Sequence, residues 1–142
     1  MRLLLAALLA ASCAGPASKP GAKAAPGREA REAALGLAAS WERGSAEEFF
    51  SRFDEDAFPD WSAFRDRARA ALLSRKSRSL RFIVDGVTAA GAESEVAVKW
   101  DEAYVDEDGR PQKASGECAL LLRARPSGGM ALRALRGDSP FE

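Results

Sequence analysis

The chain contains no histidine among its 142 residues, and it has only two cysteines and one tyrosine. Without histidine it cannot build a Ser-His-Asp or Cys-His nucleophile, and it lacks a common zinc ligand and the side chain that most readily moves protons near neutral pH. Lysine plus arginine and aspartate plus glutamate both number 21, so the formal net charge is zero. A neutral chain gains little from the phosphates of a nucleic acid. We therefore expect no metal site, no cofactor and no nucleic-acid partner.

The sequence also lacks an apolar run long enough to cross a bilayer, which takes about 20 residues. The run at residues 3–11 is too short for a span. It follows Arg2 and precedes small residues, which is the arrangement of a secretory signal. The start of the chain therefore predicts export rather than a transmembrane anchor.

The sequence LAASC at residues 9–13 resembles the lipobox of bacterial lipoproteins, with Ala10 where that family prefers Leu. The resemblance implies that residues 1–12 are a signal peptide that is cut away, that Cys13 receives a diacylglyceryl group, and that the new N-terminus is acylated. Ala14 after the cysteine then implies the outer membrane, facing the periplasm, in a host with two membranes. Ordinary secretion after an Ala-x-Ala-like site is the alternative that the residues leave open.

Residues 13–28 are rich in Ala, Gly, Pro, Ser and Lys and contain no large apolar side chain. We expect them to form the lipid anchor and a disordered tether. With Cys13 carrying lipid, Cys118 has no disulfide partner in the chain. Cys118 stands in an apolar strand pattern, which favours a buried inert thiol over a reactive or intermolecular one. Residues 29–142 are predicted to form one domain.

Three stretches carry apolar residues every three or four positions, which predicts three helices. The first runs from Arg28 to Gly44. The second starts at the capping box Ser45-Ala46-Glu47-Glu48, in which the Ser45 and Glu48 side chains would each satisfy a backbone donor. The third opens at Pro59 with Asp60 as its cap. The predicted apolar faces carry Ala34, Leu37, Ala38 and Trp41, then Ala46, Phe49, Phe50 and Phe53, and finally Trp61, Phe64, Ala68, Ala71 and Leu72.

Beyond Ser79 the apolar period changes to two, which predicts four strands separated by turn signals at 90–91, 106–109 and 127–129. The short turns imply antiparallel neighbours. In the last run, Leu132 and Leu135 can share a face only if the strand contains a bulge. The predicted inner face carries Leu80, Phe82, Val84, Val96, Val98, Trp100, Cys118, Leu120 and Leu122, and the outer face Arg81, Asp85, Lys99, Asp101, Glu117 and Arg123.

These elements predict an α+β domain in which N-terminal helices pack on one face of an antiparallel sheet of about four strands. The element order, the opening Trp41…Gly44-Ser45…Phe49-Phe50 and the closing Leu132…Phe141 resemble the nuclear transport factor 2-like, or cystatin-like, cone fold over residues 30–141. That resemblance implies a long curved sheet. The family's first β-element between the second and third helices is missing or very short here. We expect one core cluster of Trp41, Phe49, Phe53, Trp61, Phe64, Phe82, Val98, Trp100 and Leu120.

The resemblance also implies where chemistry would lie. Members similar to ketosteroid isomerases and polyketide cyclases use carboxylates and hydroxyls inside the cone for proton transfer. The inward phase beside Trp100 has only Glu102 and Tyr104 as polar members, so they are the candidate base and oxyanion donor. The alternative, which we favour, is that both are solvated rim residues beside the 106–109 turn. The expected pocket lining is Trp41, Phe64, Phe82, Val98, Trp100, Cys118 and Leu120.

The favoured function is therefore a membrane-anchored envelope lipoprotein, held through Cys13, with a non-catalytic domain that binds a small apolar ligand or an envelope protein. The alternative is a lyase- or isomerase-like enzyme using Glu102 and Tyr104. A homodimer through the outer sheet face is a further expectation. Acidic residues crowd positions 42–60 and basic residues positions 65–81. The basic cluster either meets phosphate-bearing polymers or headgroups, or forms a solvated face answered by the acidic one.

Overall fold

The computed structural model describes residues 26–142. It contains the helices α1 (Pro26–Arg43), α2 (Ala46–Phe50) and α3 (Trp61–Ser74) and the strands β1 (Lys76–Ala90), β2 (Glu93–Val105), β3 (Pro111–Ala124) and β4 (Met130–Gly137). The predicted signal peptide, Cys13 and most of the predicted tether lie outside these residues. Helix α1 begins at Pro26, so the helix starts before the predicted domain boundary at residue 29. Proline is favoured at the first helical position, where its missing N–H costs no hydrogen bond.

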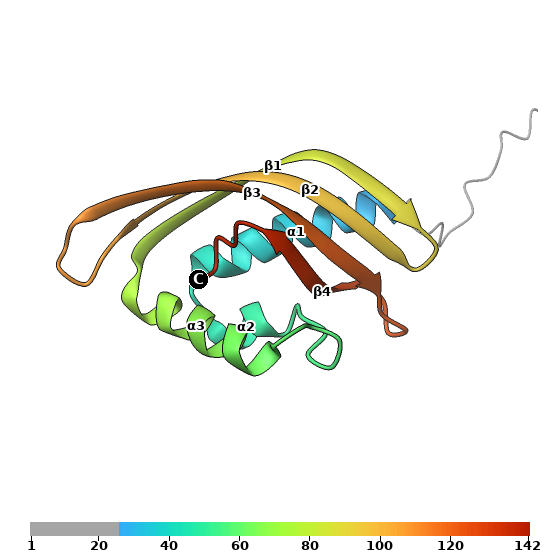
Figure 1. The fold of residues 1–142 in the computed structure, drawn as a ribbon, viewed down its shortest axis with the longest axis horizontal. Helices are drawn as coiled ribbons and strands as arrows, with labels where there is room; N and C mark the ends of the chain where they lie inside the picture. The colour runs from blue at the N-terminus through green and yellow to red at the C-terminus, as the bar shows by residue number, and fades with distance from the viewer. Residues whose placement is uncertain (1–25) are drawn as a thin grey trace, which may run out of the picture.

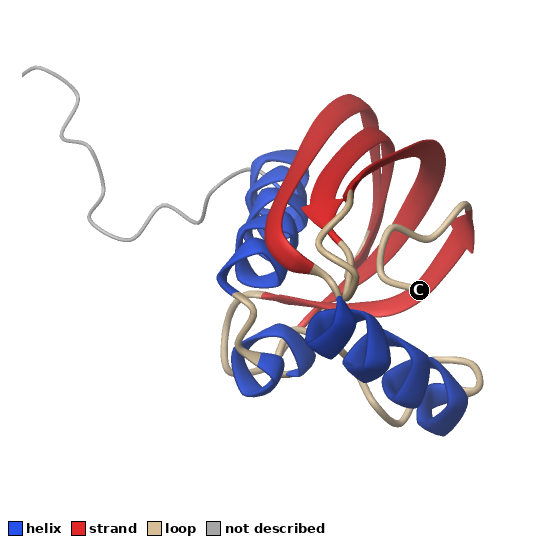
Figure 2. Ribbon diagram, turned by 90° about the vertical axis from the view of Figure 1, so that its left-hand side faces the viewer, coloured by secondary structure: helices blue, strands red, loops and turns tan. Residues whose placement is uncertain are grey.

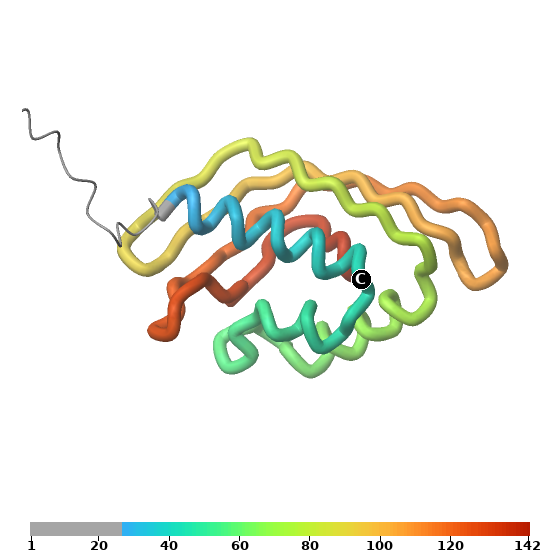
Figure 3. Tube along the Cα trace, turned by 180° about the vertical axis from the view of Figure 1, so that it is seen from behind, coloured from blue at the N-terminus to red at the C-terminus, as the bar shows by residue number. Residues whose placement is uncertain are grey.

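The four strands form one antiparallel sheet in the order β1-β2-β3-β4. The sheet arches over α1, which packs against β1 and β2, and α2 and α3 lie beneath the arch (Figure 1). The view turned by 90° shows the three helices on the same, concave side of the sheet (Figure 2). Seen from behind, α1 runs lengthwise under the strands (Figure 3). The predicted α+β architecture is confirmed, and no helix in residues 26–142 is long and apolar enough to span a membrane.

The helix ends follow the predicted positions but not all of the predicted contacts. Gly44 ends α1 with a φ of 73°, and the Ser45 hydroxyl accepts from the backbone N–H of Glu48 at 3.3 Å. The Glu48 carboxylate does not complete the capping box. It pairs with Arg43 and lies 3.5 Å from Arg52, because these cations offer a stronger partner than a backbone N–H.

Asp60 also departs from the prediction. It stands at the N-cap position of α3, but its φ of 51° is left-handed and its side chain makes no capping hydrogen bond. A capping side chain needs an extended backbone to reach back to the first turn of the helix. The left-handed backbone at Asp60 therefore turns the chain into α3 without the predicted cap.

The last strand contains the bulge that its leucines require. Leu132 pairs with Leu122 and Leu135 with Leu120, with a register shift between these pairs. The shift brings both leucines opposite inward-facing residues of β3. Between α2 and α3, Phe53 forms an isolated parallel bridge to Leu132. This bridge confirms that the β-element expected there is very short.

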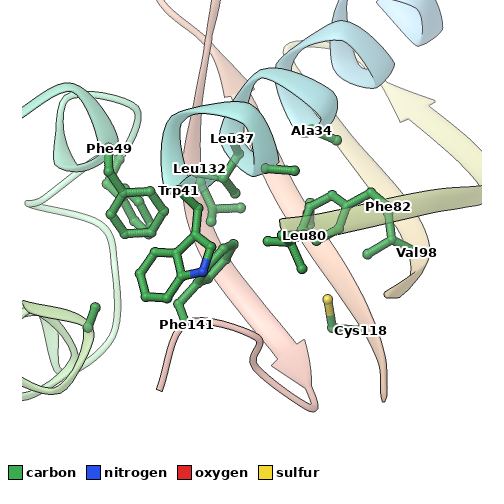
Figure 4. Close-up of a cluster of buried hydrophobic side chains, with 14 of the residues drawn as sticks. Ala34, Leu37, Trp41, Phe49, Leu80, Phe82, Val98, Cys118, Leu132 and Phe141 are labelled. Atoms are coloured by element: carbon green, nitrogen blue, oxygen red, sulfur yellow. The ribbon is translucent and has the colours of Figure 1, made fainter. Parts of the chain in front are cut away.

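The predicted core is confirmed as one buried cluster, with Trp61 partly buried against it. Figure 4 shows its centre, where Trp41 of α1 lies between Phe49 and Phe141. The inward phase of the sheet is also right, because Trp100 is buried whereas Lys99 and Asp101 are exposed.

The outer face of the sheet carries a lattice of ion pairs. Arg81 binds Asp101 at 2.8 Å, and Lys99 lies 3.6 Å from Asp85 and 3.8 Å from Glu117. Such exposed pairs contribute little to stability, about 0 to 1 kcal/mol each. Their effect is to leave most charges of this face already partnered within the chain.

Phe64→Ala tests the core. Phe64 is 3% exposed and packs on Phe53 and Phe58, so truncation should lower the free energy of unfolding by about 3 to 5 kcal/mol in urea denaturation. Ile83→Ala is the matched control, because Ile83 lies on the outer face with 45% of its surface exposed. It should cost less than about 1 kcal/mol. Equal losses in the two variants would contradict the assignment of the inner face.

Candidate functional site

Glu102 is the only acidic residue among the described residues that is classed as buried, and its side chain is 0% exposed. It follows the alternation of β2 and lies on the same inner face as Val98 and Trp100. The favoured interpretation of Glu102 as a solvated rim residue is therefore wrong. The 106–109 turn lies beyond the end of β2, but other elements cover Glu102 from the concave side.

Two donors from distant parts of the chain hold the Glu102 carboxylate. The indole Nε1 of Trp41 donates to Oε1 at 2.8 Å, and Nη1 of Arg75 donates to Oε2 at 2.8 Å. Trp41 comes from α1, and Arg75 directly follows α3. A buried carboxylate is tolerated when it is paired and hydrogen-bonded in this way. Glu102 thus connects the sheet to two helical segments.

Arg75 extends this cluster to the last residues of the chain. Its Nη1 also donates to the carbonyl of Pro140 at 3.0 Å, and its Nη2 donates to that of Glu142 at 2.6 Å. Its guanidinium carbon lies 4.9 Å from the centroid of the Tyr104 ring, a cation–π distance. Glu102 and Tyr104 are therefore neighbours of the same arginine, but the tyrosine contributes its ring rather than an oxyanion donor.

A second arginine closes the cluster from the side of β1. Arg78 donates to the carbonyls of Trp41 at 3.1 Å and Leu72 at 2.8 Å, and also to that of Arg75. Burial lowers the pKa of Arg78. Sequence reasoning placed both arginines in a basic cluster and missed their roles. Arg78 shares the inward phase of Leu80 and Phe82, which is the signal that could have identified it.

Burial also acts on the carboxylate. Loss of hydration raises the pKa of Glu102, whereas the Trp41 hydrogen bond and the charges of Arg75 and Arg78 act in the opposite direction. Desolvation is the largest influence, so the neutral form is favoured more than in water. A raised carboxylate pKa is what a general base working near neutral pH requires. Both oxygens, however, are already occupied by donors within the chain.

Aromatic rings fill the space beneath the sheet. Phe141 is 0% exposed, and its ring lies 5.1 Å from Trp41 and 5.0 Å from Phe49 between centroids (Figure 4). The carbonyl of Asp138, just before this segment, accepts from Trp100 Nε1 at 2.9 Å. Phe141 was not among the predicted core residues, although it closes the motif on which the resemblance rested. Pro140 and Phe141 of this last segment are thus part of the core.

The seven predicted pocket residues lie together in this core. Trp41, Val98 and Leu120 are almost fully buried. Phe64 also borders a cavity of about 160 Å³ beside Glu142. A role of these residues in lining a ligand pocket stays a prediction. In the structure these seven side chains pack against one another and their neighbours in the core.

Cys118 is buried in the inner face of β3. Burial, with a smaller contribution from Asp138, raises the pKa of its thiol to about 12. The thiolate is the nucleophilic and metal-binding form, so this cysteine is chemically quiet at neutral pH. Within residues 26–142 no three acidic or cysteine side chains converge as a metal site would require.

Comparison with known proteins identifies the architecture. No family model and no curated protein matches the sequence. A nuclear transport factor 2-like superfamily protein from Salmonella enterica serovar Typhimurium LT2 superposes with a TM-score of 0.67, at 15% identity, over 81% of this chain and 91% of its own. A ketosteroid isomerase-like protein from Erwinia carotovora atroseptica gives 0.62, at 12% identity, over 78% and 94%.

The CaMKII hub of S. rosetta superposes with a TM-score of 0.61, at 15% identity, over 82% of this chain and 100% of its own. These proteins carry different functions in their names, and identities this low establish shape rather than activity. Together with the arched sheet over three helices, they show that residues 26–142 have the nuclear transport factor 2-like fold.

Proposed function

We propose that this protein is a membrane-anchored lipoprotein of the cell envelope whose nuclear transport factor 2-like domain acts by binding another protein, without catalysis. The observation that carries the proposal is the filled interior. Phe141 and Trp41 occupy the space beneath the sheet, and both oxygens of Glu102 already accept hydrogen bonds. A substrate would need room and a free base, whereas a protein partner needs only the surface. The filled interior supports protein binding over the small-ligand alternative.

The anchor is proposed from the sequence. The stretch between Cys13 and Pro26 spans at most about 45 Å when fully extended. Three acyl chains on Cys13 would hold the chain firmly, because two such signals already give stable anchoring. Ala14 supports the outer membrane, facing the periplasm, as the destination.

A second candidate function rests on one observation. Glu102 is buried with a raised pKa, which is a property of the catalytic base in an isomerase- or lyase-like enzyme. Its reaction would require Phe141 and Arg75 to leave their positions in order to admit a substrate. In that case Glu102→Gln should lower turnover by about 10² to 10⁴-fold. An unchanged rate would remove this candidate.

Lipidation is tested with Cys13→Ser. The wild-type protein should partition into detergent and carry acyl mass on the peptide that begins at Cys13, as measured by mass spectrometry. The variant should lose both properties, because serine offers no thiol for the diacylglyceryl group. Recovery of an unmodified wild-type chain that begins before Cys13 would contradict the anchor.

The buried pair is tested with Arg75→Met. This change leaves Glu102 buried without its cation, and it should lower the free energy of unfolding by about 3 to 5 kcal/mol at pH 7. It also raises the folded pKa of Glu102 further. The native state then binds its proton more tightly than the unfolded chain does, so stability is present below the ordinary pKa of 4.5 and lost as the pH rises through the folded value.

The control for this test is the double variant Arg75→Met/Glu102→Gln. It removes the buried charge while keeping an acceptor for Trp41, so it should recover part of the lost stability at pH 7. The remaining loss reflects the carbonyls of Pro140 and Glu142, which do not titrate in this range. Urea denaturation between pH 4.5 and 8 separates the loss of stability caused by the buried charge, which depends on pH, from the loss caused by the two carbonyls, which does not. A loss that does not depend on pH and is not recovered would show that Glu102 carries no buried charge.

The filled interior is tested with toluene as an apolar probe. The wild-type protein should show no saturable rise of Tm with toluene, because Phe141 occupies the space. Phe141→Ala should lower the Tm but gain a toluene-dependent rise, since a dry apolar cavity of this kind binds aromatic molecules. A saturable rise in the wild-type protein would instead favour the small-ligand function.

A further inference from the structure

A groove of about 750 Å³ lies between α2 and α3, and its lining includes neither Glu102 nor the residues that hold its carboxylate, Trp41 and Arg75. The two helices lie side by side beneath the arch of the sheet (Figure 1). The groove's lining includes Phe50 of α2 and Leu72 of α3, which are apolar and mostly buried. At its border Leu73 is 76% exposed, more than Leu35 at 42% or Ile83 at 45%. A leucine so exposed beside an apolar groove is typical of a contact surface.

The charges that line the groove are divided between its two sides. Arg65 and Arg69 stand one turn apart on α3, whereas Glu47 on α2 and Glu55 after it lie on the other side. Within the described part of the chain, none of these four side chains forms an ion pair. The groove keeps the two signs apart.

Other charged side chains of the domain are used differently. Arg67, which lies between the two groove arginines in sequence, binds Glu142 at 2.8 Å. On the outer sheet face, Arg81 binds Asp101 and Lys99 lies near two carboxylates. Compared with that face, the groove offers free charges of both signs on either side of an apolar floor.

This distribution is complementary to itself. When two copies face each other across a two-fold axis that runs along the groove, the rotation exchanges the two sides. The acidic side of one copy then lies over the basic side of the other. The same rotation brings the exposed Leu73 of each copy towards the apolar floor of its partner. We propose that the α2–α3 groove is a self-association face, occupied by the same groove of a second copy of this chain.

This inference rests on the proposed function of protein binding, for which it names the partner as a second copy of the chain. The chain's own residues 14–25 are a poorer occupant, because they contain no large apolar side chain to cover Phe50 and Leu72. A second copy supplies both the apolar side chain and the charges of opposite sign. The contact is expected to weaken with salt, since its ion pairs lie at the surface.

The proposal is tested by sedimentation velocity of the full chain in the absence of detergent. The chain carries Cys13→Ser, so that lipid cannot cause the association. This chain should show a monomer–dimer equilibrium. Arg69→Glu places acids on both sides, and Glu47→Arg places bases on both sides. Each should weaken dimerisation about tenfold or more, because residue 47 of one copy then faces a like charge at residue 69 of the other. Leu73→Ser should weaken it as well, without a change in the helical circular dichroism spectrum.

The double variant Glu47→Arg/Arg69→Glu is the decisive test, since it reverses both charges of the facing pair formed by residue 47 of one copy and residue 69 of the other, and it should restore dimerisation. Arg123→Glu is the matched control for Arg69→Glu, because it makes the same change in net charge at an exposed arginine of β3. It should leave the dimer intact. A monomer at all concentrations, or a dimer that ignores the groove variants, overturns the inference. If the wild-type protein carries no lipid on Cys13 but the Cys13→Ser chain dimerises as expected, the inference is supported and only the proposed anchor is contradicted.

Discussion

The buried carboxylate of Glu102 is the interaction on which this structure most depends. It sits on the concave face of β2, and its two donors come from the end of α1 and from the residue after α3. The same arginine holds the carbonyls of Pro140 and Glu142. One desolvated charge thus fixes the position of the sheet, two helical segments and the last residues of the chain relative to one another. Its hydration is lost, so its partners must all be in place together.

This arrangement also explains how a fold that hosts enzymes can be filled. In the resembled fold the space beneath the sheet is where chemistry takes place, and here Trp41, Phe49 and Phe141 pack into it. The polar groups of Glu102, Trp41 and Arg75 are directed at one another rather than at an empty space. One fold can host many functions, and the interior of this domain is filled. The role of the domain is therefore better sought on its surface than in its interior.

The sequence predicted the elements and the core because periodicity is a local property. Alternation placed Val98, Trp100 and Leu120 on the right face, and the spacing of Leu132 and Leu135 showed that they could share a face only if the strand contained a bulge. It failed where a partner lies far away in the chain. No residue near Glu102 in the sequence indicates that Trp41 and Arg75 are its partners, so a carboxylate four residues before the 106–109 turn was interpreted as solvated. The cap at Asp60 failed for a different reason, since a side-chain preference cannot reveal a left-handed backbone.

The place where α1 begins has a consequence for how the domain would be attached through the proposed anchor at Cys13. Gly27 lies beside Val87, near the β1–β2 hairpin, whereas Gly44 at the other end of α1 borders the α2–α3 groove. Helix α1 has 18 residues and is about 27 Å long. A chain held through Cys13 would be attached at the hairpin end of the domain, with the groove at the other end of α1. Confinement of such chains to one surface raises their effective concentration, so a contact too weak to persist in dilute solution becomes populated there.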